Sequence, residues 1–160
     1  MSVDMYLKVD GAVGESKDAN HKEWSDLISL DWGASQPGSM TTGGGGGIGK
    51  VSFNDLNVVA RLDKAAPAIM KYCASGKHIG TVEISVCKAG GTQMEYSKFT
   101  LEDVLVTSVS YTAAQDGDAL LVNYSFQAGK VKQQYWEQTA QGGKGAENLV
   151  AWNIKENREA

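Results

Sequence analysis

The sequence predicts a mainly β fold, a barrel or sandwich of short strands with one helix on its flank. Apolar and polar residues alternate along many short segments, turn residues separate these segments, and only one segment has convincing helical periodicity. A chain of 160 residues with 42% hydrophobic content can bury one sizeable core and contains no clear linker. We therefore expect one soluble domain over residues 1–160.

The first two strands are expected at residues 3–9 and 24–32. In the first, apolar side chains alternate with polar ones until Asp10 and Gly11 form a turn. In the second, WSDLISLDW, alternation predicts that Ile28, Leu30 and Trp32 face the core. The opposite face of this strand then consists of small polar side chains, namely Ser25, Ser29 and Asp31.

One strand is expected at residues 50–62, and the helix follows at residues 64–75. Asp63 suits the N-cap, Pro67 lies in the first turn where its missing amide does little harm, and Gly76 stands where the helix should stop. The apolar stripe of this helix comprises Ala66, Ile69, Met70 and Cys73.

The rest of the chain predicts strands with turns between them. The strands are expected at residues 79–88, 93–100, 102–112, 120–127, 131–138 and near 150–154. Turn residues separate them at 89–91, 116–118 and 129–130.

Composition argues against several classes of function. The net charge of −4 is spread along the chain without a basic stripe, so we expect no nucleic-acid binding. No segment has the length of a membrane span, and Asp4, Lys8 and Asp10 interrupt the apolar start that a secretory signal would need. Two cysteines in a chain of this size favour reduced packing residues and folding in the cytoplasm.

The glycine run at residues 43–47 raises the question of a phosphate-binding loop. Read from Gly44, the sequence gives Gly-x-x-x-x-Gly-Lys, which ends at Lys50. A working loop of this kind needs Ser or Thr after the lysine and a helix behind it, but Val51 and an expected strand follow. We favour a flexible loop, which becomes ordered only against an external surface, because fixing consecutive glycines is entropically costly.

The segment GESKDANHKEW, residues 14–24, places Ser16, Asp18 and His21 close together. This combination suggests a hydrolase, but no nucleophile elbow is present and catalytic triads come from distant parts of a chain. A metal site would have only His21 and nearby carboxylates as ligands. A polar turn that binds local backbone amides is favoured, and we expect no cofactor or metal.

Several segments together resemble the Hcp family, the hemolysin-coregulated proteins of type VI secretion systems. These segments are MYLKVDGAVGESKDANHKEW, SLDWG, GSMTTGGGGGIGKVSF, KYCASGKHIG, FTLEDVLVTSVSY and WNIKEN. They follow one another over essentially the whole chain. The resemblance implies a two-sheet β-barrel with a flanking helix, similar to phage tail-tube proteins. It also implies a hexameric ring that stacks into a tube, propelled by a contractile sheath.

The resemblance implies a structural protein and no enzyme. Its partners would be further copies of the chain, a spike protein of the VgrG type, the sheath, and effectors carried in the ring lumen. The protein would assemble in the bacterial cytoplasm and be secreted without a cleaved signal peptide. No nucleic-acid partner or membrane insertion is implied.

Two groups of residues receive roles from the resemblance. The strand before the extended loop contributes to the channel wall, so Ser25, Ser29 and Asp31 are expected in the lumen. The ring-stacking loop corresponds to Ser39, Met40, Thr41, Thr42, Gly43, Gly44, Gly45, Gly46, Gly47, Ile48, Gly49 and Lys50.

Two other classes of function stay open from the sequence. A carbohydrate-binding or small-molecule-binding β-module would use exposed Trp and Tyr side chains and could remain a monomer. A nucleotide-dependent enzyme would need Lys50. The mass of the assembled protein tests the first alternative, and nucleotide titration of Lys50→Ala tests the second.

Overall fold

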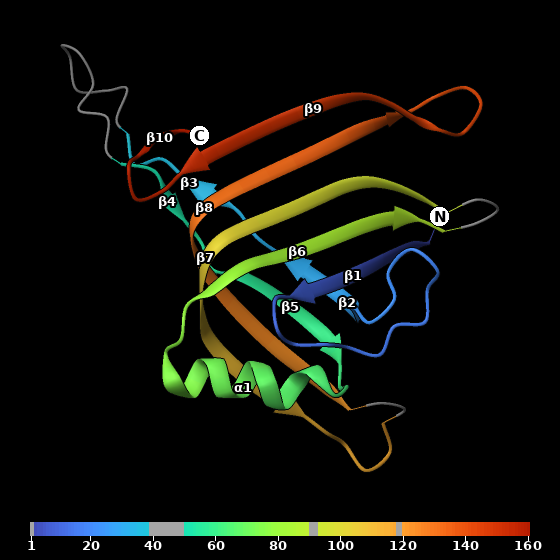
Figure 1. Cartoon of the computed structure of the whole chain (residues 1–160), viewed down its shortest axis with the longest axis vertical. Coiled ribbons are helices and arrows are strands. Elements are labelled where there is room, and N and C mark those ends of the chain that lie inside the picture. Colours follow the sequence, from blue (N-terminus) through green and yellow to red (C-terminus); the bar gives the residue numbers. More distant parts are fainter. Residues whose placement is uncertain (1, 39–49, 90–92, 118–119) are drawn as a thin grey trace.

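Six strands close into a barrel in the computed structural model, which describes residues 2–38, 50–89, 93–117 and 120–160 (Figure 1). Around the barrel the order is β8-β5-β2-β1-β6-β7, and β7 pairs with β8 to close it. Two further strands, β9 and β10, extend the sheet outward from β8. The predicted mainly β barrel with a flanking helix is confirmed.

The elements follow one another as ten strands and one helix within the described residues. Their bounds are β1 Val3–Val9, β2 Ser25–Asp31, β3 Ala34–Ser35, β4 Ser52–Phe53, β5 Leu56–Arg61, α1 Ala65–Ser75, β6 Ile79–Lys88, β7 Met94–Thr112, β8 Leu121–Gln138, β9 Lys144–Asn153 and β10 Arg158–Glu159. The strand expected at residues 50–62 is therefore divided, because β4 pairs with β3 and β5 enters the barrel.

The helix α1 begins one residue later than the sequence predicts, with Lys64 as its N-cap. The Asp63 carboxylate still accepts the amide of Ala65 at 3.0 Å. Gly76 ends the helix in the left-handed conformation, with φ of 69°, and its amide donates to the carbonyl of Tyr72. Ile69 is buried against the barrel, whereas Met70 of the expected apolar stripe is exposed.

Two long strands replace the four shorter ones expected after residue 93. No turn forms at residues 129–130, and β8 runs straight through Gly129. A Cβ on Gly129 would lie 3.0 Å from the Asp103 carboxylate and from Cε of Lys155. Glycine therefore suits the close packing of β8 against β7, where Asp103 has a φ of 53°, because a methyl group would displace the Asp103 and Lys155 side chains.

The core fills the barrel and the space beneath α1. Its largest fully buried side chains are Tyr124, Phe126, Leu7, Leu56, Ile69, Ile84 and Leu101. Burial raises the pKa of Tyr124, so this phenol stays neutral.

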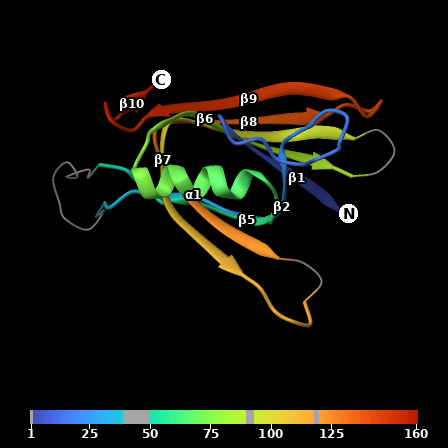
Figure 2. The ribbon, with the colours of Figure 1, turned by 60° about the horizontal axis from the view of Figure 1, so that its bottom comes forward.

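Figure 2 shows α1 crossing the barrel, with the connected ends of β7 and β8 projecting beyond it. No helix in the described parts of the chain is long and apolar enough to cross a membrane.

Candidate functional site

Four neighbouring barrel strands, β2, β5, β8 and β7, carry small polar side chains along their outer face. The pairing register aligns these side chains in two rows across the strands. One row is Asp31, Asn57, Ser125 and Ser108, and the other is Ser29, Asn123 and Ser110, with the apolar Val59 between Ser29 and Asn123. We call these two rows the polar face.

Hydrogen bonds tie the polar face together across the strands. The Ser125 hydroxyl donates to Oδ1 of Asn57 at 2.5 Å, which joins β8 to β5. Nδ2 of Asn123 lies 3.5 Å from Oγ of Ser110, which links β8 to β7. Amide and hydroxyl groups both donate and accept hydrogen bonds, so this face can make weak polar contacts with protein surfaces of varied sequence.

Two of the three predicted lumen residues lie on the polar face. Ser29 and Asp31 are exposed there, but Ser25 is buried, with 3% of its surface accessible beneath Gly14. The expected position of Ser25 beside Ser29 and Asp31 is therefore wrong. Ile28, expected in the core, is 43% exposed.

A β-bulge explains both errors. The register of β2 against β5 shifts between Leu27 and Ser29, so Ile28 occupies an additional position in the strand. Before the bulge, Ser25 and Leu27 point inward, and after it Ser29 and Asp31 point outward. Strict alternation cannot reveal such an insertion.

The members of the polar face on β5, β7 and β8 were not predicted from the sequence. A signal was present, because Asn123 and Ser125 alternate with buried Val122 and Tyr124. This alternation does not show which residues of the neighbouring strands lie beside Asn123 and Ser125. Only the register shows that Asn57 lies opposite both Asp31 and Ser125.

Two short strands that pair with each other flank the predicted ring-stacking loop, β3 before it and β4 after it. Ala34 of β3 pairs with Phe53 of β4, and Ser35 pairs with Ser52. Ser39 to Gly49 lie outside the described residues, so their predicted role is untested, and Lys50 is exposed. β4 follows Lys50, in place of the helix that a phosphate-binding loop requires.

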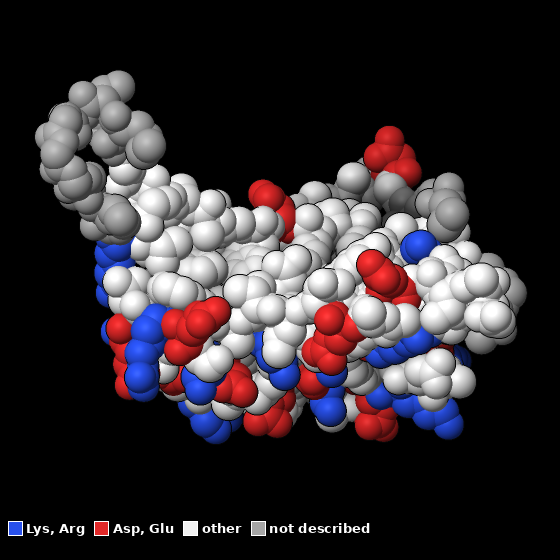
Figure 3. Space-filling model, turned by 90° about the horizontal axis from the view of Figure 1, so that it is seen from above, with Lys and Arg blue, Asp and Glu red and all other residues white. Residues whose placement is uncertain are grey.

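Exposed apolar side chains lie on β9 and the adjoining part of β8, with Leu149 on one face of the sheet and Val150 and Tyr135 on the other. Leu149 is 58% exposed, Val150 51% and Tyr135 45%. Within the described chain, β9 pairs with β8 along its length but with β10 only at Trp152 and Asn153, so one edge is otherwise open. The β9 side, which faces the viewer in Figure 3, has few charges at its centre and many along one margin.

The serine that contacts His21 in the structure is not the one that the hydrolase interpretation suggests. His21 lies 2.7 Å from Asp18, but its other nitrogen meets Ser85 of β6 at 3.0 Å, not Ser16. Ser85 has no accessible surface, so its hydroxyl cannot reach a substrate. Among the residues the structure describes, no three His, Cys, Asp or Glu side chains gather where they could hold a metal ion.

The family model described as "Type VI secretion system effector, Hcp" matches residues 6–135 of the chain. The chain belongs to the Hcp family. It is 43% identical over 162 residues to Protein hcp1 of Pseudomonas aeruginosa, with all of both chains covered.

Solved Hcp structures share the fold of this chain. The crystal structure of Hcp1 from Salmonella typhimurium superposes with a TM-score of 0.83 at 35% identity, covering all of both chains. A structure described as a type six secretion system protein superposes with a TM-score of 0.92 at 26% identity, covering 99% of this chain and 100% of the other. The chain is thus a type VI secretion protein of the Hcp family.

Proposed function

We propose that this Hcp is the tube subunit of a type VI secretion system. Six chains would form a ring, and rings would stack into the inner tube that the contractile sheath propels. Residues 1–160 would act as one domain with a structural and not a catalytic role. The observation that carries the proposal is the match to Hcp proteins over the full chain, together with the open edge of β9.

The open edge of β9 supports ring formation. An exposed strand edge with apolar side chains favours association, and soluble proteins cover such edges. Leu149 and Val150 provide apolar surface at this edge on the two opposite faces of the sheet. Contact between this surface and a different surface of the next copy is a heterologous interface, which closes into a ring when the rotation permits.

The polar face supports a channel that carries cargo. We infer that Ser29 and Asp31 line the lumen together with Asn57 and Ser125, which share their outward face. Six copies of Asp31 would form a band of negative charge. Such a band attracts proteins with basic patches, whereas the neutral side chains around it limit adhesion.

Replacing Asp31 with asparagine is expected to weaken binding of a basic cargo by about tenfold at low salt, because six like charges are removed from one band. Binding titrations at low and high salt measure this effect, and the loss should shrink as salt rises. Asp116→Asn, which removes an exposed charge between β7 and β8, is the control. Unchanged binding of every cognate cargo in Asp31→Asn would exclude recognition by the charge band.

The ring-stacking loop supplies a second test. Deleting Gly43 to Gly47 is expected to leave the ring intact by size-exclusion chromatography but to impair tube growth and secretion. These glycines lack side chains, and their backbone can lie close to a neighbouring ring. Normal secretion of the deletion variant would contradict the assignment of this loop.

The remaining partners follow from the tube role. We infer that the tube carries a VgrG-type spike at its tip and effectors in its lumen. Assembly would take place in the bacterial cytoplasm, and the subunit would leave the cell as part of the tube.

The proposal is tested by native mass and by microscopy. A ring would have about six times the 17.1 kDa chain mass. Negative-stain images should show six-fold rings with a central hole. A monomer at all concentrations would overturn the ring and favour an isolated β-module.

A further inference from the structure

A chain of polar groups, buried at His21 and Ser85 and partly exposed at Asp18 and Glu95, fastens the β1–β2 loop, residues 10–24, to the barrel. Nδ1 of His21 lies 2.7 Å from Oδ2 of Asp18, and Nε2 lies 3.0 Å from Oγ of Ser85. That hydroxyl is also 2.5 Å from Oε2 of Glu95 on β7. We call these four residues, Asp18, His21, Ser85 and Glu95, the buried chain.

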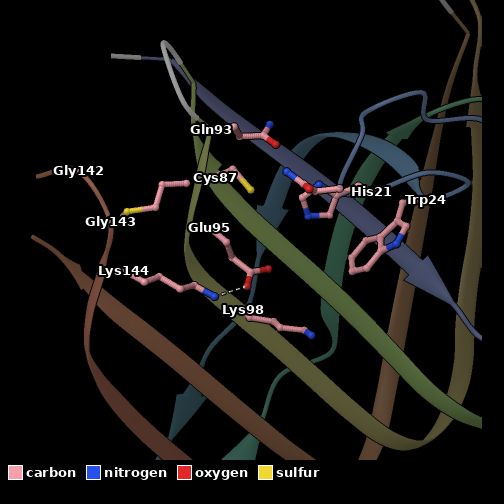
Figure 4. Close-up of a pocket in the computed structure, with 11 residues that line it drawn as sticks. His21, Trp24, Cys87, Gln93, Glu95, Lys98, Gly142, Gly143 and Lys144 are labelled. Atoms are coloured by element: carbon pink, nitrogen blue, oxygen red, sulfur yellow. Dashed lines mark hydrogen bonds and ion pairs between the residues drawn. The ribbon is translucent and has the colours of Figure 1, made fainter.

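The buried chain borders a cavity of about 490 Å³ between the β1–β2 loop and the β8–β9 hairpin. Figure 4 shows His21 and Trp24 on one side, Lys144 on the other, and Glu95 between them. Nζ of Lys144 lies 3.0 Å from Oε1 of Glu95. These groups already satisfy one another, which favours an internal fastening over a ligand site.

Three contacts in the buried chain require three hydrogens. Carboxylates bring none, a serine hydroxyl brings one, and a neutral imidazole brings one. The 2.5 Å contact places the Ser85 hydrogen toward Glu95. Nε2 of His21 must then donate to Ser85, and Nδ1 must donate to Asp18. The third hydrogen makes the imidazole a cation.

Both carboxylates accept hydrogen bonds from several donors. Burial acts to raise the pKa of Glu95, but hydrogen bonds from Ser85 and Lys144 outweigh it and the pKa lies below its usual value. Oδ2 of Asp18 accepts the backbone amide of Asn20 at 3.2 Å in addition to His21. With its amide nitrogen turned toward Asp18, Gln93 donates to both carboxylate oxygens at 3.2 Å.

The other neighbours of the imidazole are compatible with a positive charge. Tyr6 of β1 stacks on the His21 ring with centroids 4.2 Å apart, and an aromatic face attracts a cation. Burial raises the pKa of the Cys87 thiol, which therefore stays neutral. Lys98 across the cavity is neutralised by Glu83 at 2.9 Å. The charged and titratable groups around the site are Tyr6, Asp18, Glu83, Cys87, Glu95, Lys98 and Lys144.

We propose that His21 is held doubly protonated and that the buried chain is a proton-dependent fastening of the β1–β2 loop. When all three contacts are made, Asp18, His21, Ser85 and Glu95 together hold one proton more than they do when one contact is broken. By mass action, raising the pH favours the broken form and loosens the loop. Lowering the pH toward neutrality restores the third contact.

The protonation of His21 can be measured directly in the full-length protein. The chain has two histidines, so labelling histidine with ¹⁵N gives a simple solid-state NMR spectrum, and His78→Gln assigns its signals. We expect both ring nitrogens of His21 to carry hydrogen at pH 7. A single protonated nitrogen in the wild-type protein would overturn the proposal, whatever the variants show.

The Glu95→Gln variant should remove the positive charge of the His21 imidazole while keeping the three contacts. A glutamine amide can donate to Ser85, whose hydroxyl then donates to Nε2, so all three contacts persist with a neutral imidazole. We expect one protonated ring nitrogen in this variant. Glu83→Gln, which removes a charge from the neighbouring Lys98 pair, is the matched control and should leave His21 doubly protonated.

Hydrogen exchange of the β1–β2 loop tests the fastening itself. Between pH 6 and pH 9, protection in the wild-type protein should fall about tenfold after correction for intrinsic rates, the equivalent of one hydrogen bond. Glu95→Gln should show no such fall. Equal pH dependence in the wild type and Glu95→Gln would refute the proton-dependent fastening.

Discussion

Replacing Leu149 and Val150 together with aspartate is expected to reduce the native mass from six chains to one while the barrel stays folded. Both side chains are more than half exposed in the isolated subunit, so new charges there cost the barrel little. In a ring, the same charges would lie buried and unpaired at each subunit contact. Burying such charges costs several kcal/mol, which exceeds what a subunit interface of ordinary strength can absorb.

Analytical ultracentrifugation measures the loss of the ring, and circular dichroism shows whether the barrel is retained. The matched control is Val13→Asp with Leu120→Asp, since these side chains are 47% and 50% exposed and lie outside β9. A six-chain mass for the Leu149 and Val150 variant would show that the β9 surface is not a subunit contact.

Gly14→Ala is expected to lower the free energy of unfolding by about 1–3 kcal/mol. A Cβ at this position would lie 2.5 Å from the Trp24 carbonyl oxygen and 2.6 Å from Oγ of Ser25. The Gly14 amide also donates to the carbonyl of Glu23 at 2.7 Å, so the two ends of the β1–β2 loop are held together here. The backbone must shift to admit even one methyl group.

Urea unfolding followed by tryptophan fluorescence measures the change. Gly38→Ala is the control, because a Cβ there would meet nothing within 4 Å. We expect that variant to stay within about 0.5 kcal/mol of the wild type. If the two variants have equal stability, the close approach of Gly14 to Trp24 is not a packing constraint.

Local pattern was sufficient to predict the type of fold and most elements. Alternation located β1, and helical periodicity with Pro67 and Gly76 located α1 to within one residue. These features depend on residues a few positions apart, so their physical causes are visible in the sequence. The family resemblance added the barrel closure, which depends on the pairing of β7 with β8.

Features that depend on distant residues were predicted poorly. Gly129 has the sequence features of a turn, yet it allows β8 to pass close to Asp103. The contact of His21 with Ser85 spans 64 positions, so the sequence suggested Ser16 as the nearer serine. The positions of the polar face on β5, β7 and β8 were likewise missed, because strand register is a tertiary property.

The long ladder between β7 and β8 also has a mechanical consequence. Its pairs extend from Ser97 opposite Tyr135 to Thr112 opposite Leu121. A force along these strands acts on all the hydrogen bonds between them at once, so these bonds must break together. A force across the edge of β9 would instead break the hydrogen bonds between β9 and β8 one after another. We therefore expect the subunit to resist a force along β7 and β8 better than a force across the edge of β9, and the proposed tube would carry axial thrust best with these two strands near the direction of load.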